Sequence, residues 1–115
     1  VEIRPVASAF FDYHAKYDAG ACEEVVPVPR PEALLRCIQR QALLAHRVLG
    51  CRGISRTDMI LGPDDILYVL ETNTLPGLTP ASLVPKSYAA DGGNYAGLLD
   101  MLVKTALRRS HGNSQ

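Results

Sequence analysis

Residues 65–86, DILYVLETNTLPGLTPASLVPK, run an apolar strand directly into polar residues and then into a long loop. The strand pattern ends at Glu71, Thr72 and Asn73, and the loop carries Gly77 and three prolines. A strand that only had to end would need a single turn. Two oxygen-bearing side chains followed by a glycine and small polar residues are more typical of a binding site than of a strand terminus.

The strand in this stretch has a partner just upstream. Residues 53–61, GISRTDMIL, alternate, and the turn sequence GPDD separates them from residues 66–73. The two runs therefore predict an antiparallel hairpin. Strict alternation places on one face of each run the following side chains: Ile54, Arg56, Asp58 and Ile60 in the first, and Leu67, Val69, Glu71 and Asn73 in the second.

The rest of the chain predicts helices around this hairpin. Residues 1–17 are mostly extended in character, and residues 17–31, rich in Gly and Pro, predict a surface loop. Residues 31–50 predict an amphipathic helix that begins at Pro31, ends at Gly50 and buries its apolar positions through Val48 and Leu49. A short helix is expected within 82–92, and a final one over 94–110 with Asn94 as its cap. This order indicates an α+β fold, an antiparallel sheet backed by helices.

Composition excludes several classes of function. The 115 residues are 47% hydrophobic and 21% charged with zero formal net charge, so no field favours nucleic acid or an anionic membrane. No apolar run approaches the roughly 18 residues of a membrane span, and the N-terminus lacks the shape of a signal peptide. Three cysteines without metal-type spacing predict reduced thiols and a cytoplasmic location. The opening residues look like the middle of a strand, which indicates a fragment or a processed chain.

Four polar residues of the hairpin are candidates for chemistry. Asp58, Glu71 and Asn73 form a hard oxygen set that suits Mg²⁺ or Mn²⁺. Arg56 on the same face is placed to stabilise a developing anion. A solvated sheet face is the competing interpretation, because one face of an antiparallel sheet is often wet. Gly77 either permits a positive φ in an ordinary loop or lets a backbone N–H approach an oxyanion.

Together these segments resemble the C-terminal part of the D-alanine–D-alanine ligase family of ATP-grasp enzymes. The resemblance is carried by FFDYHAKY, GCRGISRTDMIL, YVLETNTLPGLTPASLVPK and the closing amphipathic helix, and it covers nearly the whole chain. It implies that residues 1–115 are the C-terminal part of an ATP-grasp ligase domain, without the N-terminal domain and most of the central domain.

The resemblance also implies a role for each matching residue. It implies Asp58, Glu71 and Asn73 as ligands of two Mg²⁺ ions, with Mn²⁺ as an alternative; Arg56 and the Gly77 N–H as the oxyanion pocket; Ser82 and Leu83 as the site of the acceptor carboxylate; Lys16 as a phosphate contact; Tyr17 as a loop residue that closes the site; and Phe10 and Leu70 as the lining of the adenine pocket.

The implied reaction joins two D-alanines with ATP through an acyl phosphate, for peptidoglycan precursor synthesis. We expect ATP and D-alanine as small-molecule partners, a homodimer of the intact enzyme, and no nucleic-acid or membrane partner. We expect the chain by itself to be inactive, because it carries about half of an active site. The alternatives are another ATP-grasp carboxylate–amine ligase, a member that uses D-lactate as second substrate, or an inactive fragment that self-associates through exposed edges.

Overall fold

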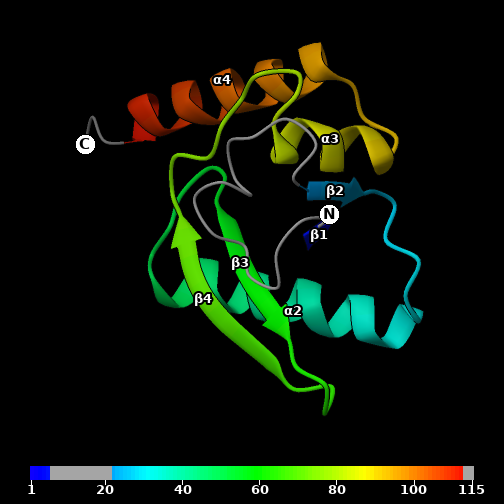
Figure 1. Ribbon diagram of the computed structural model, residues 1–115. Coiled ribbons are helices and arrows are strands. Elements are labelled where there is room, and N and C mark those ends of the chain that lie inside the picture. Colours follow the sequence, from blue (N-terminus) through cyan, green and yellow to red (C-terminus); the bar gives the residue numbers. More distant parts are fainter. Residues whose placement is uncertain (6–21, 113–115) are drawn as a thin grey trace.

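A computed structural model of the chain describes residues 1–5 and 22–112 and confirms the α+β class (Figure 1). The elements, in chain order, are strands β1 (Glu2–Pro5) and β2 (Cys22–Val25), helix α2 (Glu32–Val48), strands β3 (Arg56–Leu61) and β4 (Leu67–Asn73), and helices α3 (Leu83–Ala90) and α4 (Tyr95–Gly112). The strands form two separate antiparallel pairs, β1–β2 and β3–β4. The sequence predicted a single sheet, so the division into two small ones is a finding of the structure.

Strand β2 was not expected, because residues 17–31 predicted a surface loop. Its four residues pair with β1, with Glu2 opposite Val25 and Pro5 opposite Cys22. The guanidinium of Arg30, just beyond β2, also donates to the Glu2 carboxylate at 2.9 Å. The prediction was wrong because the Gly and Pro residues on either side dominate the local pattern, whereas the strand depends on a partner some twenty residues away.

Helix α2 confirms the predicted stop at its C-terminus. Gly50 has a φ of 64°, the Gly50 N–H donates to the Arg47 carbonyl at 3.0 Å, and the Cys51 N–H donates to the His46 carbonyl at 2.9 Å. This is the Schellman arrangement, which satisfies carbonyls that a helix end leaves without partners. At the other end, Pro31 lies just before the helix instead of forming its first residue.

The β3–β4 hairpin is confirmed, but an irregularity in β4 changes its faces. The register runs through Asp58 opposite Glu71 and then Met59 opposite Val69, which leaves Leu70 as an extra residue in a β-bulge. A bulge reverses the alternation beyond it. Leu67 and Val69 therefore lie on the face opposite Glu71, and the prediction that they share its face was wrong.

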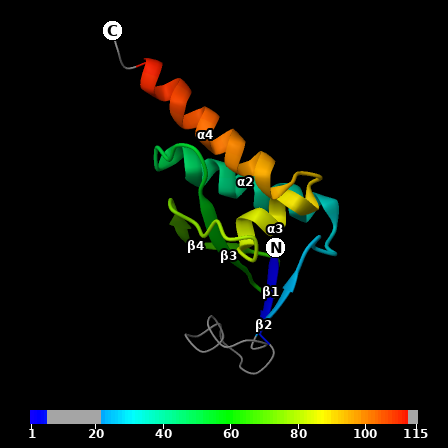
Figure 2. The ribbon, with the colours of Figure 1, turned by 90° about the horizontal axis from the view of Figure 1, so that it is seen from above.

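Helix α2 covers one side of the hairpin. Helix α2 contacts both strands of the hairpin, and α3 contacts α4; Figure 2 shows the same arrangement from a second direction. In the described part of the chain, Leu98 of α4 is the one apolar side chain that is almost completely buried, at 1% exposure. The prediction that Val48 and Leu49 are in the core was wrong: at the C-terminal end of α2 they are 76% and 63% exposed. None of the described helices combines the length and the hydropathy needed to cross a bilayer.

Candidate functional site

The hairpin brings its predicted polar residues together on one face. Arg56 lies directly opposite Asn73, and Asp58 lies directly opposite Glu71. Directly opposed residues of an antiparallel pair share a face, with Cβ atoms about 5 Å apart. The bulge residue, Leu70, lies between Glu71 and the turn of the hairpin, so the bulge leaves this set intact. The prediction that Asp58 projects on the same side as Glu71 and Asn73 is confirmed.

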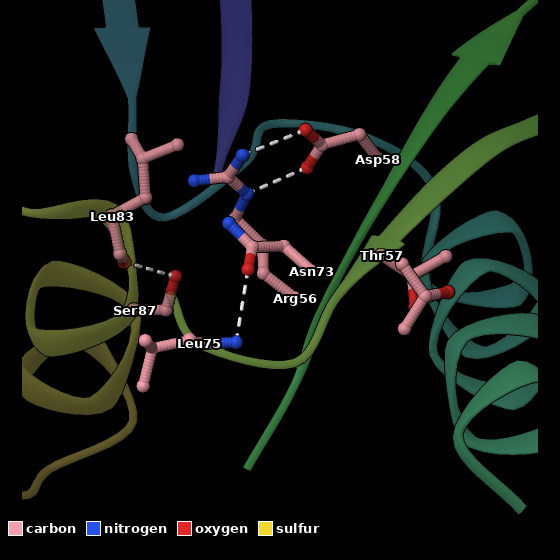
Figure 3. Close-up of polar contacts among 8 residues, drawn as sticks. Arg56, Thr57, Asp58, Asn73, Leu75, Leu83 and Ser87 are labelled. Atoms are coloured by element: carbon pink, nitrogen blue, oxygen red, sulfur yellow. Dashed lines mark hydrogen bonds and ion pairs between the residues drawn. The ribbon is translucent and has the colours of Figure 1, made fainter. Parts of the chain in front are cut away.

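A two-pronged ion pair holds Asp58. The Arg56 Nε donates to Asp58 Oδ1 at 2.7 Å, and Arg56 Nη2 donates to Oδ2 at 2.9 Å (Figure 3). Both side chains are about one-third exposed. The hydrogen bonds to Asp58 raise the pKa of the Arg56 guanidinium, and the negative charge of Glu71 adds to this rise. The face therefore carries one positive and two negative groups in mutual reach.

Asn73 begins the loop that follows the strand. Its Oδ1 accepts a hydrogen bond from the Leu75 N–H at 2.9 Å, a local turn that redirects the chain (Figure 3). An amide oxygen has a second lone pair, so this bond leaves it able to ligate a cation.

The donor set fits Mg²⁺. Within residues 1–5 and 22–112, no three His, Cys, Asp or Glu side chains gather as a metal cluster. Asp58 and Glu71 instead offer two carboxylates, and Asn73 lies on the same face of the hairpin. Mg²⁺ usually takes one or two carboxylates and completes its octahedron with water and phosphate oxygens. An all-protein cage for zinc is therefore absent from the described residues, and an open magnesium site is chemically consistent with them.

Gly77 touches Ser82 across the loop. A Cβ on Gly77 would lie 2.8 Å from Ser82 Oγ, closer than real contacts allow. Ser82 Oγ is itself engaged, because it accepts from the Thr79 N–H at 3.1 Å and lies 2.8 Å from Thr79 Oγ1. The φ of Gly77 is not positive. The interpretation that glycine is needed here for a positive φ was wrong, and the close approach to Ser82 is the structural reason instead.

The loop ends at the N-terminus of α3, which confirms the predicted short helix. Ser82 precedes the helix in an extended conformation and Leu83 is its first residue. The first N–H groups of a helix have no partners within it and carry a partial positive charge, so they attract carboxylates. Inside the helix, the Ser87 hydroxyl donates to the Leu83 carbonyl at 2.8 Å (Figure 3). An ion pair between Lys86 and Glu24 ties α3 to β2.

Two supporting contacts were not predicted. On the reverse face of the hairpin, Thr57 Oγ1 and Thr72 Oγ1 lie 3.1 Å apart, between the two polar pairs of the site. Behind them, His46 Nδ1 of α2 lies 2.8 Å from Ser55 Oγ, beside an open cavity of about 360 Å³. Figure 3 shows Thr57 pointing toward α2. Alternation signals the position of Thr57, but its partner follows only from the pairing register.

Four residues of the predicted nucleotide and lid sites remain. Phe10, Lys16 and Tyr17 lie outside the described residues, so their predicted roles stay predictions. Leu70 is the extra residue of the bulge and is 60% exposed. Its side chain is therefore accessible at the strand edge, and its role at an adenine ring stays a prediction as well. The cysteines Cys22, Cys37 and Cys51 form no disulfide.

Comparison with known families and proteins identifies what the chain is similar to. The family model described as "D-ala D-ala ligase C-terminus" matches residues 1–104. D-alanine–D-alanine ligase from Desulfotalea psychrophila is 49% identical over 104 residues, which are 90% of this chain and 32% of that protein. The ligase from Oleidesulfovibrio alaskensis is 46% identical over 113 residues, 98% of this chain and 36% of that one. The chain thus spans about a third of the length of these relatives.

Solved structures of ligases are also similar to this chain. D-alanine–D-alanine ligase from Bacillus anthracis, in complex with ATP, superposes with a TM-score of 0.77 at 43% identity, covering 97% of this chain and 36% of that one. The VanG D-Ala:D-Ser ligase from Enterococcus faecalis superposes with a TM-score of 0.73 at 32% identity, covering 90% and 29%.

Proposed function

The chain belongs to the D-alanine–D-alanine ligase family, as its C-terminal part, and from this we propose that it supplies half of the active site of an ATP-dependent enzyme that joins two D-alanines. The observation that carries the proposal is the placement of Arg56, Asp58 and Glu71 on one face of the hairpin, next to the loop from Gly77 to Ser82. The residues proposed to stabilise anions and those proposed to bind the acceptor then lie on consecutive segments of the chain.

In the proposed reaction, a carboxylate oxygen of the first D-alanine attacks the γ-phosphorus of ATP, which forms an acyl phosphate and releases ADP. The amine of the second D-alanine then attacks the acyl carbon. The tetrahedral adduct loses a proton from nitrogen and expels inorganic phosphate, which leaves the peptide bond. Negative charge concentrates on oxygen in both steps, so positioned positive groups and N–H donors lower both barriers.

Arg56 and the Gly77 N–H are the proposed groups for the oxyanion of the tetrahedral adduct. The guanidinium of Arg56 stays charged at any relevant pH, and its pKa is raised further by Asp58. Gly77 lacks a side chain that would screen its N–H from the adduct. Its contact with Ser82 couples this donor to the next part of the site.

Asp58, Glu71 and Asn73 are the proposed ligands for magnesium, or manganese in its place. When bound, the metal would neutralise charge on the ATP phosphates. The protein's own contribution is to hold the three oxygens on one face through the register of β3 and β4. The bulge at Leu70 contributes too, because it lets Leu67 face α2 while Glu71 stays on the site face.

Ser82 and Leu83 are the proposed hold on the carboxylate of the second D-alanine. The N-terminus of α3 supports this, because its N–H groups suit an anion and its first turn contains no acidic residue. The D-Ala:D-Ser ligase among the similar structures carries a different second substrate in its name. D-alanine as the second substrate is therefore the finer part of the proposal.

The proposal also covers the nucleotide and the closing loop, through Leu70 and three residues outside the described ranges. Phe10 and Leu70 would line the adenine pocket, Lys16 would contact phosphate, and Tyr17 would help close the site against water, since an acyl phosphate hydrolyses readily. We also propose a cytoplasmic homodimer for the whole protein, without a nucleic-acid or membrane partner, acting in peptidoglycan precursor synthesis.

The test is the reaction itself, run with the natural full-length protein, ATP, D-alanine and Mg²⁺. We expect one D-alanyl-D-alanine, by mass spectrometry, for each ADP and phosphate released. Glu71→Gln should lower the rate at least about 100-fold. Glu32→Gln is the matched control, because Glu32 is an exposed carboxylate that pairs with Arg36 on α2, and it should leave the rate unchanged. ATP turnover without the dipeptide would favour another carboxylate–amine ligase instead.

A further inference from the structure

The two-pronged bond from Arg56 engages both oxygens of Asp58, the carboxylate that the proposed function assigns to metal. Glu71 lies opposite Asp58, and among residues 1–5 and 22–112 the bond from Arg56 goes to Asp58, whereas Glu71 acts on Arg56 through its charge. One of the two proposed ligand carboxylates is therefore held by a cation of the protein itself. This arrangement raises the question of what Arg56 does when a second cation arrives.

We propose that Arg56 and the metal compete for Asp58, so that metal loading releases the Arg56 guanidinium toward the substrate anion. The inference rests on the proposed function and adds an order of events to it: the metal binds first, and Arg56 contacts the substrate anion afterwards. Before loading, the pair neutralises Asp58 and holds its carboxylate in place. After loading, the metal balances the charge of Asp58 in place of Arg56. The guanidinium is then free to contact the oxyanion.

Electrostatic repulsion between the metal and Arg56 favours the release. A carboxylate has about four lone-pair sites, so geometry alone would let a guanidinium and a metal share it. A divalent cation and a guanidinium on the same carboxylate lie within about 4 Å, however, and repel strongly in a site that is only partly solvated. The two side chains here are one-third exposed, so water screens this repulsion incompletely. Release of Arg56 relieves it.

The length of the Arg56 side chain permits the release. Arg56 lies opposite Asn73, at the end of β4 where the loop to Gly77 begins. Its long flexible stem lets the guanidinium leave Asp58 without movement of the strand. The strand itself is held from the reverse face by the Thr57–Thr72 contact at 3.1 Å. The switch therefore concerns one side chain on a fixed frame.

The experiment follows the Arg56 Nε–H signal by NMR in the natural full-length protein with labelled arginine. Mg²⁺ is titrated without nucleotide or D-alanine. In the metal-free protein we expect a signal protected from solvent exchange, because the Nε donates to Asp58 at 2.7 Å. Saturating Mg²⁺ should remove that protection. Arg36, which donates from Nε to Glu32 at 3.1 Å on α2, is the matched control, and its signal should not change.

A second readout uses the affinity for Mn²⁺, measured by electron paramagnetic resonance. Arg56→Lys keeps the positive charge but loses the planar two-pronged fork. If the pair with Asp58 competes with the metal, this variant should bind Mn²⁺ about three- to sixfold more tightly. Arg36→Lys should bind it with unchanged affinity. If only the positive charge at position 56 mattered, Arg56→Lys would also bind Mn²⁺ with unchanged affinity. That result would overturn the inference.

These experiments distinguish failure of the competition at Asp58 from failure of the proposed metal site. Metal binding that is lost in Glu71→Gln, together with a Nε–H signal that stays protected at saturation, would overturn the competition and leave the metal site standing. Metal binding that is indifferent to both Asp58→Asn and Glu71→Gln would overturn the site and the inference together. Loss of protection with a tighter Arg56→Lys variant supports both.

Discussion

Replacing Gly77 with alanine tests the contact that joins the two halves of the loop. The new Cβ would lie 2.8 Å from Ser82 Oγ and 3.4 Å from Ser82 Cβ. The second distance is tolerable with a small adjustment, whereas the first forces the Ser82 hydroxyl to rotate away. That rotation breaks its bond with the Thr79 N–H at 3.1 Å and its contact with Thr79 Oγ1 at 2.8 Å.

The magnitude follows from these two interactions. Each hydrogen bond contributes about 0.5–1.5 kcal/mol net, so their loss would cost about 1–3 kcal/mol. Alanine also restricts the unfolded chain, which offsets about 0.4–1 kcal/mol where the native φ suits it. Gly77 does not have a positive φ, so this offset applies. The Gly77→Ala variant should therefore be less stable by about 1.3 kcal/mol, and by no more than about 2.6 kcal/mol.

A double-mutant cycle with Ser82→Ala provides the measurement. Without Oγ the close contact disappears, so Gly77→Ala in that background should keep only the effect on the unfolded chain and stabilise the protein by about 0.4–1 kcal/mol. The four proteins are compared by urea unfolding of the natural full-length chain, with hydrogen exchange of the Thr79 amide as a local readout. An equal cost of Gly77→Ala in both backgrounds would refute the reasoning, because the hydroxyl would then play no part.

Three further predictions test other elements. Asn94→Ala should destabilise the protein by about 1 kcal/mol, because the Asn94 carboxamide caps α4, and Asn94→Asp should restore most of the loss in thermal unfolding. Leu98→Ala should cost about 2–5 kcal/mol, whereas Leu75→Ala, at an 87% exposed site, should stay within about 0.5 kcal/mol in urea unfolding. Hydrogen bonding, chiefly from Arg30, lowers the pKa of Glu2 from 4.5 to about 2, so its carboxylate stabilises the fold above pH 4.5 and loses that effect as the pH falls toward 2. The urea midpoints of the native protein and Glu2→Gln should therefore differ at pH 7 and converge below pH 4.5; a constant difference would contradict the assignment.

Local patterns determined much of this protein. The helix ends at Gly50 and Asn94 follow from backbone rules that operate within a few residues, and both are as predicted. The pairing of the hairpin follows from alternation around one turn. The polar set of Arg56, Asp58 and Glu71 on one face follows in turn, because the bulge lies beyond it. The string from Glu71 to Pro85 also indicated the family, which the comparisons show.

Tertiary structure decided what depends on distant partners. Strand β2 exists because β1 offers it an edge, and no pattern within Cys22–Val25 signals that edge. The bulge at Leu70 returns Leu67 to the side of α2, and an inserted residue in a ladder has no signature in alternation. The need for glycine at position 77 comes from Ser82 five residues away, across a loop whose path the sequence does not specify. Short-range patterns therefore determined the helices and the hairpin of this chain, whereas pairing and close approach between separated segments decided strand β2, the faces of β4 and the assembly of the loop from Gly77 to Ser82.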